Sequence, residues 1–197
     1  MTTGTDASTK PLPRVARTPF YYGWVILIVA ALGNFASAPG QSYTFSVFQN
    51  SFISDLNMSS TSVSTLYLFG SLTAAGSIIF VGRSLDKYGP RRMMVFAGLF
   101  LGLGAIWLSQ VSAPWQLFVG FAIMRTMGQG ALSLIPATMV SVWFVRKRPI
   151  ALALMALGGA LASSIYPFYG ATLIEEFGWR SAWGTIAITG WGLLLAP

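Results

Sequence analysis

Long apolar runs alternate with short polar or charged segments along most of this chain. Six such runs cover about residues 20–48, 63–81, 93–111, 115–144, 150–174 and 181–195. A helix needs about 20 residues to cross roughly 30 Å of hydrocarbon. The pattern therefore predicts an all-α membrane protein with six transmembrane helices.

Composition supports this class and excludes others. The chain is 54% hydrophobic and 9% charged, whereas about a quarter of the residues in a soluble domain are charged. The net charge of +7 does not indicate a nucleic-acid partner, because the basic residues lie at the ends of apolar runs and not along one binding face. The chain has no Cys and no His. We therefore expect no metal site, no cofactor and no enzyme activity based on histidine or thiolate chemistry.

The chain divides into two parts. Residues 1–19 are polar, contain three basic residues and have no apolar period, so we expect a disordered tail. Residues 20–197 form the predicted six-helix transmembrane domain. In its first apolar run, Pro39 and Gly40 interrupt the helix, and the residues that follow are unusually polar. Such residues are tolerated in a membrane where they face protein or a water-filled cavity.

The segment Gly82–Arg92 is the most strongly charged in the chain, with four Lys or Arg residues and one Asp. A charged side chain costs about 2.5–3.5 kcal/mol at the centre of a membrane helix. We therefore expect a short turn at the membrane surface, with a positive φ at Gly89 and with Pro90 in the first turn of the next helix. Polar loops are expected at 50–62 and 175–180.

Basic residues are divided unequally between the two sides of the predicted bundle. The tail holds three, the Gly82–Arg92 turn four and the Arg146–Arg148 turn three, whereas the opposite side holds only Arg180. Loops rich in Lys and Arg remain in the cytoplasm. The bias predicts that the N-terminus and both basic turns are cytoplasmic. We expect a multi-pass protein of the cell (inner) membrane.

The basic turn also carries a family resemblance. The sequence GRSLDKYGPRR, between the second and third spans, resembles the cytoplasmic signature of the major facilitator superfamily, G-x-x-x-D-[RK]-x-G-x-[RK]-[RK]. The matching residues are Gly82, Asp86, Lys87, Gly89, Arg91 and Arg92. Supporting motifs are RTMGQG at 125–130, WFVRKR at 143–148, FGWRSAW at 177–183 and YYGW at 21–24. The last three are most similar to the bacterial monocarboxylate and oxalate/formate antiporter branch.

The resemblance implies a fold, a mechanism and partners. It implies that this chain is the N-terminal half of a twelve-helix carrier that moves a small organic anion by alternating access. The implied partners are the lipid bilayer, the anion, and a missing C-terminal six-helix half or a second copy of this chain. The resemblance also implies that Asp86 and its basic neighbours form a conformational latch. A solvated turn that only obeys the charge rule is the alternative for these residues.

Arg125 is the strongest candidate for a substrate-binding residue. It lies ten residues into the fourth apolar run, about 15 Å from the end of that helix at ~1.5 Å per residue. No acidic residue occurs in any apolar run to neutralise it, so an anionic substrate or water is expected beside it. The alternative is a structural or snorkelling Arg. Further candidates, for which structural hydrogen bonding is the alternative, are Gln41, Tyr43, Gln129, Tyr166 and Tyr169.

Two classes of function follow from these features. The first is a secondary active transporter of a small, monocarboxylate-like anion. The second is a non-transporting six-helix membrane subunit or remnant. Continuation of the reading frame into six further spans would favour the first class, whereas a stop codon after Pro197 would favour the second.

The charge bias generates a test of orientation. Because the chain lacks cysteine, single cysteines can be introduced and labelled with a membrane-impermeant reagent in intact cells. Cysteines near Lys87 and Lys147 should resist labelling, and a cysteine at Asn57 should react. Labelling at the first two positions would contradict the predicted topology.

Overall fold

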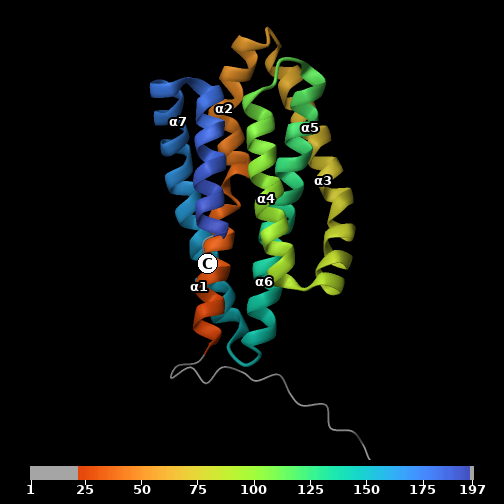
Figure 1. The fold of residues 1–197 in the computed structure, drawn as a ribbon, viewed down its shortest axis with the longest axis vertical. Coiled ribbons are helices and arrows are strands. Elements are labelled where there is room, and N and C mark those ends of the chain that lie inside the picture. Colours follow the sequence, from red (N-terminus) through yellow and green to blue (C-terminus); the bar gives the residue numbers. More distant parts are fainter. Residues whose placement is uncertain (1–21, 196–197) are drawn as a thin grey trace, which may run out of the picture.

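The computed structural model describes residues 22–195, so the predicted tail at residues 1–19 lies outside the described residues. The described chain is helical almost throughout, which confirms the predicted all-α class (Figure 1). In chain order, the elements are α1 (Gly23–Ala36), η1 (Ala38–Gly40), α2 (Ser42–Asp55), α3 (Ser60–Tyr88), α4 (Pro90–Ser109), α5 (Pro114–Met124), η2 (Arg125–Ala131), α6 (Leu132–Trp143) and α7 (Arg148–Leu195). The element η1 is a 3-10 helix and η2 is a π-helix.

Five helical stretches of the described chain are long and apolar enough to cross a membrane: Gly23–Asp55, Ser60–Tyr88, Pro90–Ser109, Pro114–Trp143 and Arg148–Leu194. The last one would be about 70 Å long if straight, at ~1.5 Å per residue. It reverses instead at Gly178, which has φ 76° and ψ 157°. The limbs 148–177 and 179–195 run side by side in opposite directions (Figure 1). The described chain thus crosses the bundle six times, and the predicted loop at 175–180 is wrong because one glycine makes the turn.

The basic segment Gly82–Arg92 is more helical than the sequence indicated. The helix α3 continues to Tyr88 and α4 begins at Pro90, so Gly89 alone makes the turn. The φ of Gly89 is 80°, as predicted, in a region that glycine reaches because it has no Cβ. Pro90 occupies the predicted place in the first turn of α4. Both helices therefore extend from the apolar runs into the charged segment.

The two ends of the bundle differ in charge. The basic segments Gly82–Arg92 and Arg146–Arg148 lie at the same end as the start of α1 (Figure 1). The α2–α3 connection lies at the opposite end, where the predicted loop 50–62 shortens to residues 56–59 because α2 reaches Asp55 and α3 starts at Ser60.

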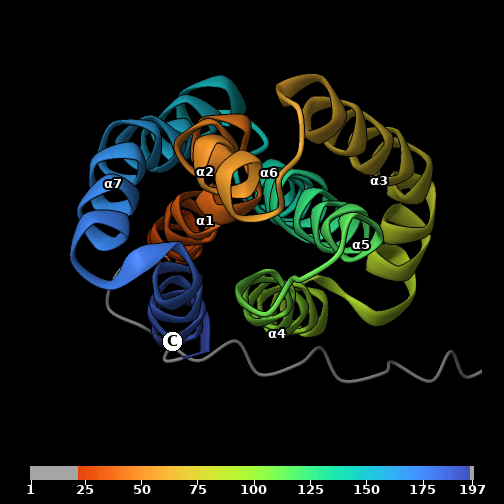
Figure 2. The ribbon, with the colours of Figure 1, turned by 90° about the horizontal axis from the view of Figure 1, so that it is seen from above.

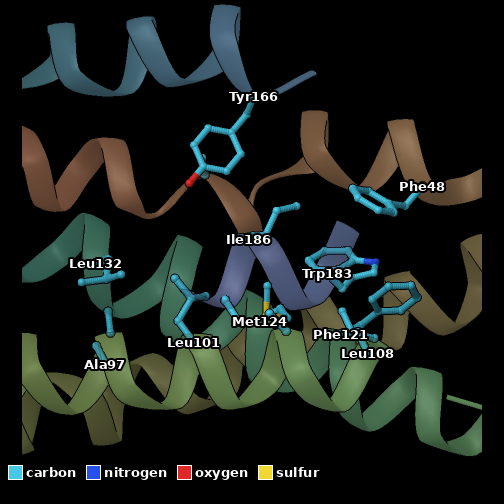
Figure 3. Packing of buried hydrophobic residues seen from close by; sticks show 14 of the residues in the cluster. Phe48, Ala97, Leu101, Leu108, Phe121, Met124, Leu132, Tyr166, Trp183 and Ile186 are labelled. Atoms are coloured by element: carbon cyan, nitrogen blue, oxygen red, sulfur yellow. The ribbon is translucent and has the colours of Figure 1, made fainter. Parts of the chain in front are cut away.

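An aromatic cluster holds the helices together toward the less basic end. Figure 3 shows Trp183 of α7 beside Phe48 of α2, with ring centroids 4.5 Å apart. Phe121 of α5 and Leu108 of α4 complete the cluster, and all four side chains are buried. Aromatic side chains bury large areas and dominate core energetics. The cluster therefore joins four elements that are distant in sequence.

The two interrupted spans touch each other at glycines. A Cβ added to Gly128 in η2 would lie 2.7 Å from the Cα of Gly40 in η1, and a Cβ added to Gly40 would meet the carbonyl oxygen of Met124. Neither backbone can move away as a flexible side chain would. The predicted break at Pro39 and Gly40 is therefore the place where the first span packs against the π-helix of the fourth.

This contact predicts a selective loss of stability. Replacing Gly40 by Ala should lower the free energy of unfolding by about 1–3 kcal/mol, the usual cost of overpacking, as measured by thermal unfolding in detergent. The control is Gly76→Ala, because an added Cβ at Gly76 in α3 would have no neighbour within 4 Å. Equal stability of the two variants would contradict the close contact.

Candidate functional site

Arg125 lies at the start of η2, where the fourth span changes from α-helix to π-helix. Its side chain is half-buried and reaches the broken part of the first span. Nη1 donates hydrogen bonds to the carbonyl oxygen of Gly40 at 3.4 Å and to Oγ of Ser42 at 3.2 Å. The break in the first span thus supplies the acceptors, because a carbonyl at the end of a helix has no partner within that helix.

Tyr67 of α3 fixes the other side of the guanidinium. The Cζ of Arg125 lies 4.9 Å from the centroid of the Tyr67 ring, and an aromatic face attracts a cation at this distance. The Tyr67 hydroxyl donates to Oγ of Ser42 at 3.0 Å. The same ring stacks on Phe45, with centroids 3.9 Å apart and planes 13° apart. Ser42 therefore accepts from both Arg125 and Tyr67.

One edge of the guanidinium remains available. Both hydrogen bonds to protein come from Nη1, and in residues 22–195 neither Nε nor Nη2 has a protein acceptor. The ion pair found in this part of the chain is Arg180 with Asp55, so no carboxylate neutralises Arg125. The Nε and Nη2 edge matches a carboxylate in two parallel hydrogen bonds. The arrangement can bind an anion without breaking the contacts that hold the side chain.

Of the other predicted site residues, Gln41 lines a cavity together with Arg125. The cavity is small, at about 10 Å³, and has room for one water at most. Nε2 of Gln41 donates to Oγ of Ser37 at 3.1 Å. This cavity is therefore too small to hold an organic anion.

The remaining candidates are more scattered. Gln129 is exposed one turn beyond Arg125 in η2, and Tyr43 is half-buried against the core. Tyr166 is buried and points from α7 toward the first span (Figure 3). Its ring lies 5.7 Å from Phe35 and 6.1 Å from Tyr169. The structure groups the two α7 tyrosines with each other and gives them no direct contact with Arg125.

The sequence did not single out Ser42 or Tyr67 as site residues. Ser42 stood out only as one of several polar residues after the Pro39 break. A single Tyr in an apolar run such as Tyr67 is indistinguishable by pattern from residues that face lipid. Its position opposite Arg125 depends on how α3 packs, which local sequence does not specify.

The predicted latch residues lie at the basic end of the α3–α4 pair. They are Gly82, Asp86, Lys87, Gly89, Arg91 and Arg92. Asp86 is exposed, and within residues 22–195 it forms no ion pair. Also in the described chain, no cluster of acidic side chains could hold a metal ion. The latch therefore has no partner in the described residues and stays a prediction.

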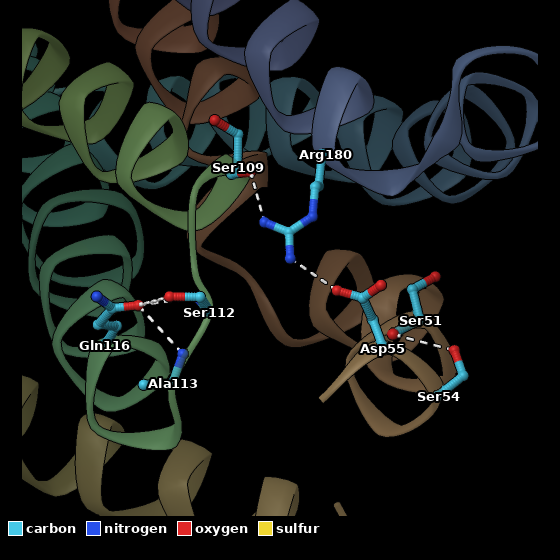
Figure 4. A network of polar contacts seen from close by, with 8 residues as sticks. All are labelled: Ser51, Ser54, Asp55, Ser109, Ser112, Ala113, Gln116 and Arg180. Carbon is cyan, nitrogen blue, oxygen red and sulfur yellow. Dashed lines mark hydrogen bonds and ion pairs between the residues drawn. The ribbon is translucent and has the colours of Figure 1, made fainter. Parts of the chain in front are cut away.

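A second polar network connects helices at the less basic end of the bundle (Figure 4). Nη2 of Arg180 pairs with Oδ2 of Asp55 at 2.7 Å, and Nη1 donates to the carbonyl oxygen of Ser109 at 3.3 Å. The guanidinium also lies 4.4 Å from the Trp179 ring. Both partners of the ion pair are exposed, so it contributes about 0–1 kcal/mol. The network joins α2, α4 and α7 and neutralises Arg180, unlike Arg125.

Comparison with known proteins gives the family. Residues 30–196 match the Major Facilitator Superfamily, and the chain belongs to this family of membrane transport proteins, whose members are not enzymes. The bundle of apolar helices and the family together make it a multi-pass membrane protein.

Individual relatives align over most of this chain but over only part of their own length. Agnestins efflux protein AgnL12 of Paecilomyces divaricatus is 29% identical over an alignment of 181 positions, gaps included, that covers 89% of this chain and 40% of the relative. Monocarboxylate transporter 3 of Gallus gallus is 29% identical over an alignment of 198 positions, gaps included, that covers 96% of this chain and 34% of the relative. The uncharacterized MFS-type transporter YhjX of Escherichia coli (strain K12) is 24% identical over an alignment of 168 positions. This alignment covers 84% of this chain and 41% of the relative. The chain spans between a third and two fifths of these relatives.

Proposed function

We propose that this chain is the N-terminal half of a secondary active transporter that moves a small, monocarboxylate-like organic anion by alternating access. The single observation that carries the proposal is Arg125. Its guanidinium lies within a membrane span, its partners Gly40, Ser42 and Tyr67 are all neutral, and one edge has no protein acceptor. An intramembrane charge of this kind is expensive and marks a substrate pathway.

The geometry of Arg125 favours a carboxylate over a neutral substrate. The ring of Tyr67 and the hydroxyl of Ser42 restrict the side chain before any ligand arrives. A fixed donor pair loses little freedom on binding, and this preorganisation increases affinity. One relative is named a monocarboxylate transporter, and another is named an efflux protein. A carboxylate on Arg125 is compatible with movement in either direction.

The other wall of the proposed site comes from outside this chain. Gln129 is exposed although it belongs to a membrane-spanning stretch, and within residues 22–195 its side-chain amide has no hydrogen-bond partner. In addition, α3 is the least buried of the five stretches. Unsatisfied polar groups facing lipid cost several kcal/mol each. A C-terminal six-helix half, or a second copy of this chain, would cover these groups. The alignments, which cover 40% and 34% of the two relatives' lengths, support the first of these.

The proposed carrier has its basic end in the cytoplasm of the cell whose inner membrane it occupies. The grouping of Gly82–Arg92 and Arg146–Arg148 at one end of the bundle supports this orientation. In the proposed cycle, Asp86 holds the cytoplasmic helix ends of the two halves together in one state and releases them in the other.

Substitutions of Arg125 distinguish a role in substrate recognition from a role in stabilising the fold. In the complete carrier, Arg125→Lys should raise the KM for a monocarboxylate about tenfold, because Lys keeps the charge but loses the two-pronged geometry. Arg125→Gln should nearly abolish uptake. The control Arg180→Gln removes a cation that is already paired and should leave the KM unchanged. Normal substrate binding by Arg125→Gln together with a lower thermal stability would make Arg125 a structural residue.

Because this chain supplies only one wall of the proposed site, we expect that residues 1–197 alone do not transport. Liposomes containing only this chain should take up a labelled monocarboxylate no faster than empty liposomes, because one wall of the site is missing. Co-reconstitution with the C-terminal half should restore uptake. Uptake by the lone chain above the empty-liposome rate would contradict the half-carrier account and favour assembly from two copies.

A further inference from the structure

A groove lies between the end of α3 and the start of α4, far from Arg125. It encloses about 350 Å³ and is lined by Ser84, Tyr88, Arg92, Met93 and Phe96. It is located at the basic end of the bundle, where the apolar part of each helix gives way to the charged turn (Figure 1). We call the polar lining of Ser84, Tyr88 and Arg92 the rim, and the apolar lining of Met93 and Phe96 the floor.

The polar groups of the rim have no protein partner. On α3 the hydroxyls of Ser71, Thr73 and Ser77 each donate to the carbonyl oxygen four residues earlier. In the described part of the chain, the hydroxyls of Ser84 and Tyr88 make no such bond. Arg92 is exposed and forms no ion pair there. Two hydroxyls and one guanidinium are therefore free to bind the same ligand.

The positive charge around the groove indicates that its ligand is an anion. The turn holds Arg83, Lys87, Arg91 and Arg92 against the single carboxylate of Asp86, a net charge of +3. No ion pair within residues 22–195 reduces it. Basic segments next to a membrane helix attract anionic lipid headgroups.

The floor of the groove continues as an apolar track along α4. The Phe96 and Phe100 rings lie 4.4 Å apart, and both are exposed on the outside of the bundle. Phe100 and Leu103 line a second groove of about 410 Å³ further along the same helix. A free phosphate would use the rim alone, whereas a molecule with an acyl chain would use the rim and the track together.

We propose that this groove binds one anionic phospholipid. The phosphodiester accepts hydrogen bonds from Arg92, Tyr88 and Ser84, and one acyl chain lies along Met93, Phe96 and Phe100. The site is separate from the proposed anion site, because none of its residues contacts Arg125, but Arg92 also belongs to the predicted latch.

Native mass spectrometry of the purified 197-residue chain, titrated with phosphatidylglycerol or phosphatidylcholine, tests this site. The wild type should retain one phosphatidylglycerol in preference to phosphatidylcholine, and millimolar inorganic phosphate should not displace it. Arg92→Gln should weaken retention about tenfold or more, as expected for loss of a hydrogen bond between charged groups. Arg91→Gln removes the same charge outside the groove and should weaken retention less.

Tyr88→Phe is the sharpest variant, because it removes one hydroxyl without changing the charge. It should weaken phosphatidylglycerol retention about two- to tenfold, as expected for one hydrogen bond. Tyr22→Phe, at the same end of the bundle but away from the groove, should have no effect. Equal retention by these two tyrosine variants, equal losses for the two arginine variants, or displacement by inorganic phosphate would overturn the proposal. Circular dichroism should show the same helix content for every variant.

Discussion

The contact between Gly40 and Gly128 is the constraint on which the rest of the central region depends. Two spans are interrupted at the same depth, one by η1 and one by the π-helix η2, and their backbones touch where neither residue has a side chain. Interrupted helices expose backbone groups that need partners, and inside a membrane these partners must come from protein or a water-filled cavity. Arg125, the first residue of η2, supplies a donor to the carbonyl oxygen of Gly40.

The same contact determines what Arg125 can do. With Nη1 held by Gly40 and Ser42, and with the Tyr67 ring against its face, the guanidinium has a fixed orientation. Arg180 has a similar set of contacts, including an aromatic ring and a backbone carbonyl, but it also has Asp55. Arg180 is therefore paired with a carboxylate, whereas Arg125 has none within residues 22–195. An external anion would neutralise Arg125 as Asp55 neutralises Arg180.

Much of the fold could be predicted, because apolar length and charge position are local properties. The six traverses, the break at Pro39 and the turn at Gly89 followed from residue types alone. The ends of the helices could not be predicted in this way, since α2 and α3 continue into polar sequence beyond the apolar runs. In the candidate site, Arg125 was predictable because its charge is anomalous in an apolar run. Tyr67 was not, because its role depends on α3 packing beside the fourth span.

The central claim is that the free edge of Arg125 binds a carboxylate. Side-chain nitrogen NMR of the complete carrier, with ¹⁵N-labelled arginine and the Arg125 resonances assigned from the Arg125→Lys variant, observes this edge directly. Titration with lactate should shift the Nε and Nη2 resonances of Arg125 in a saturable way, and the neutral isostere lactamide should leave them unchanged. Unchanged Arg125 resonances at lactate concentrations that saturate transport would contradict the account.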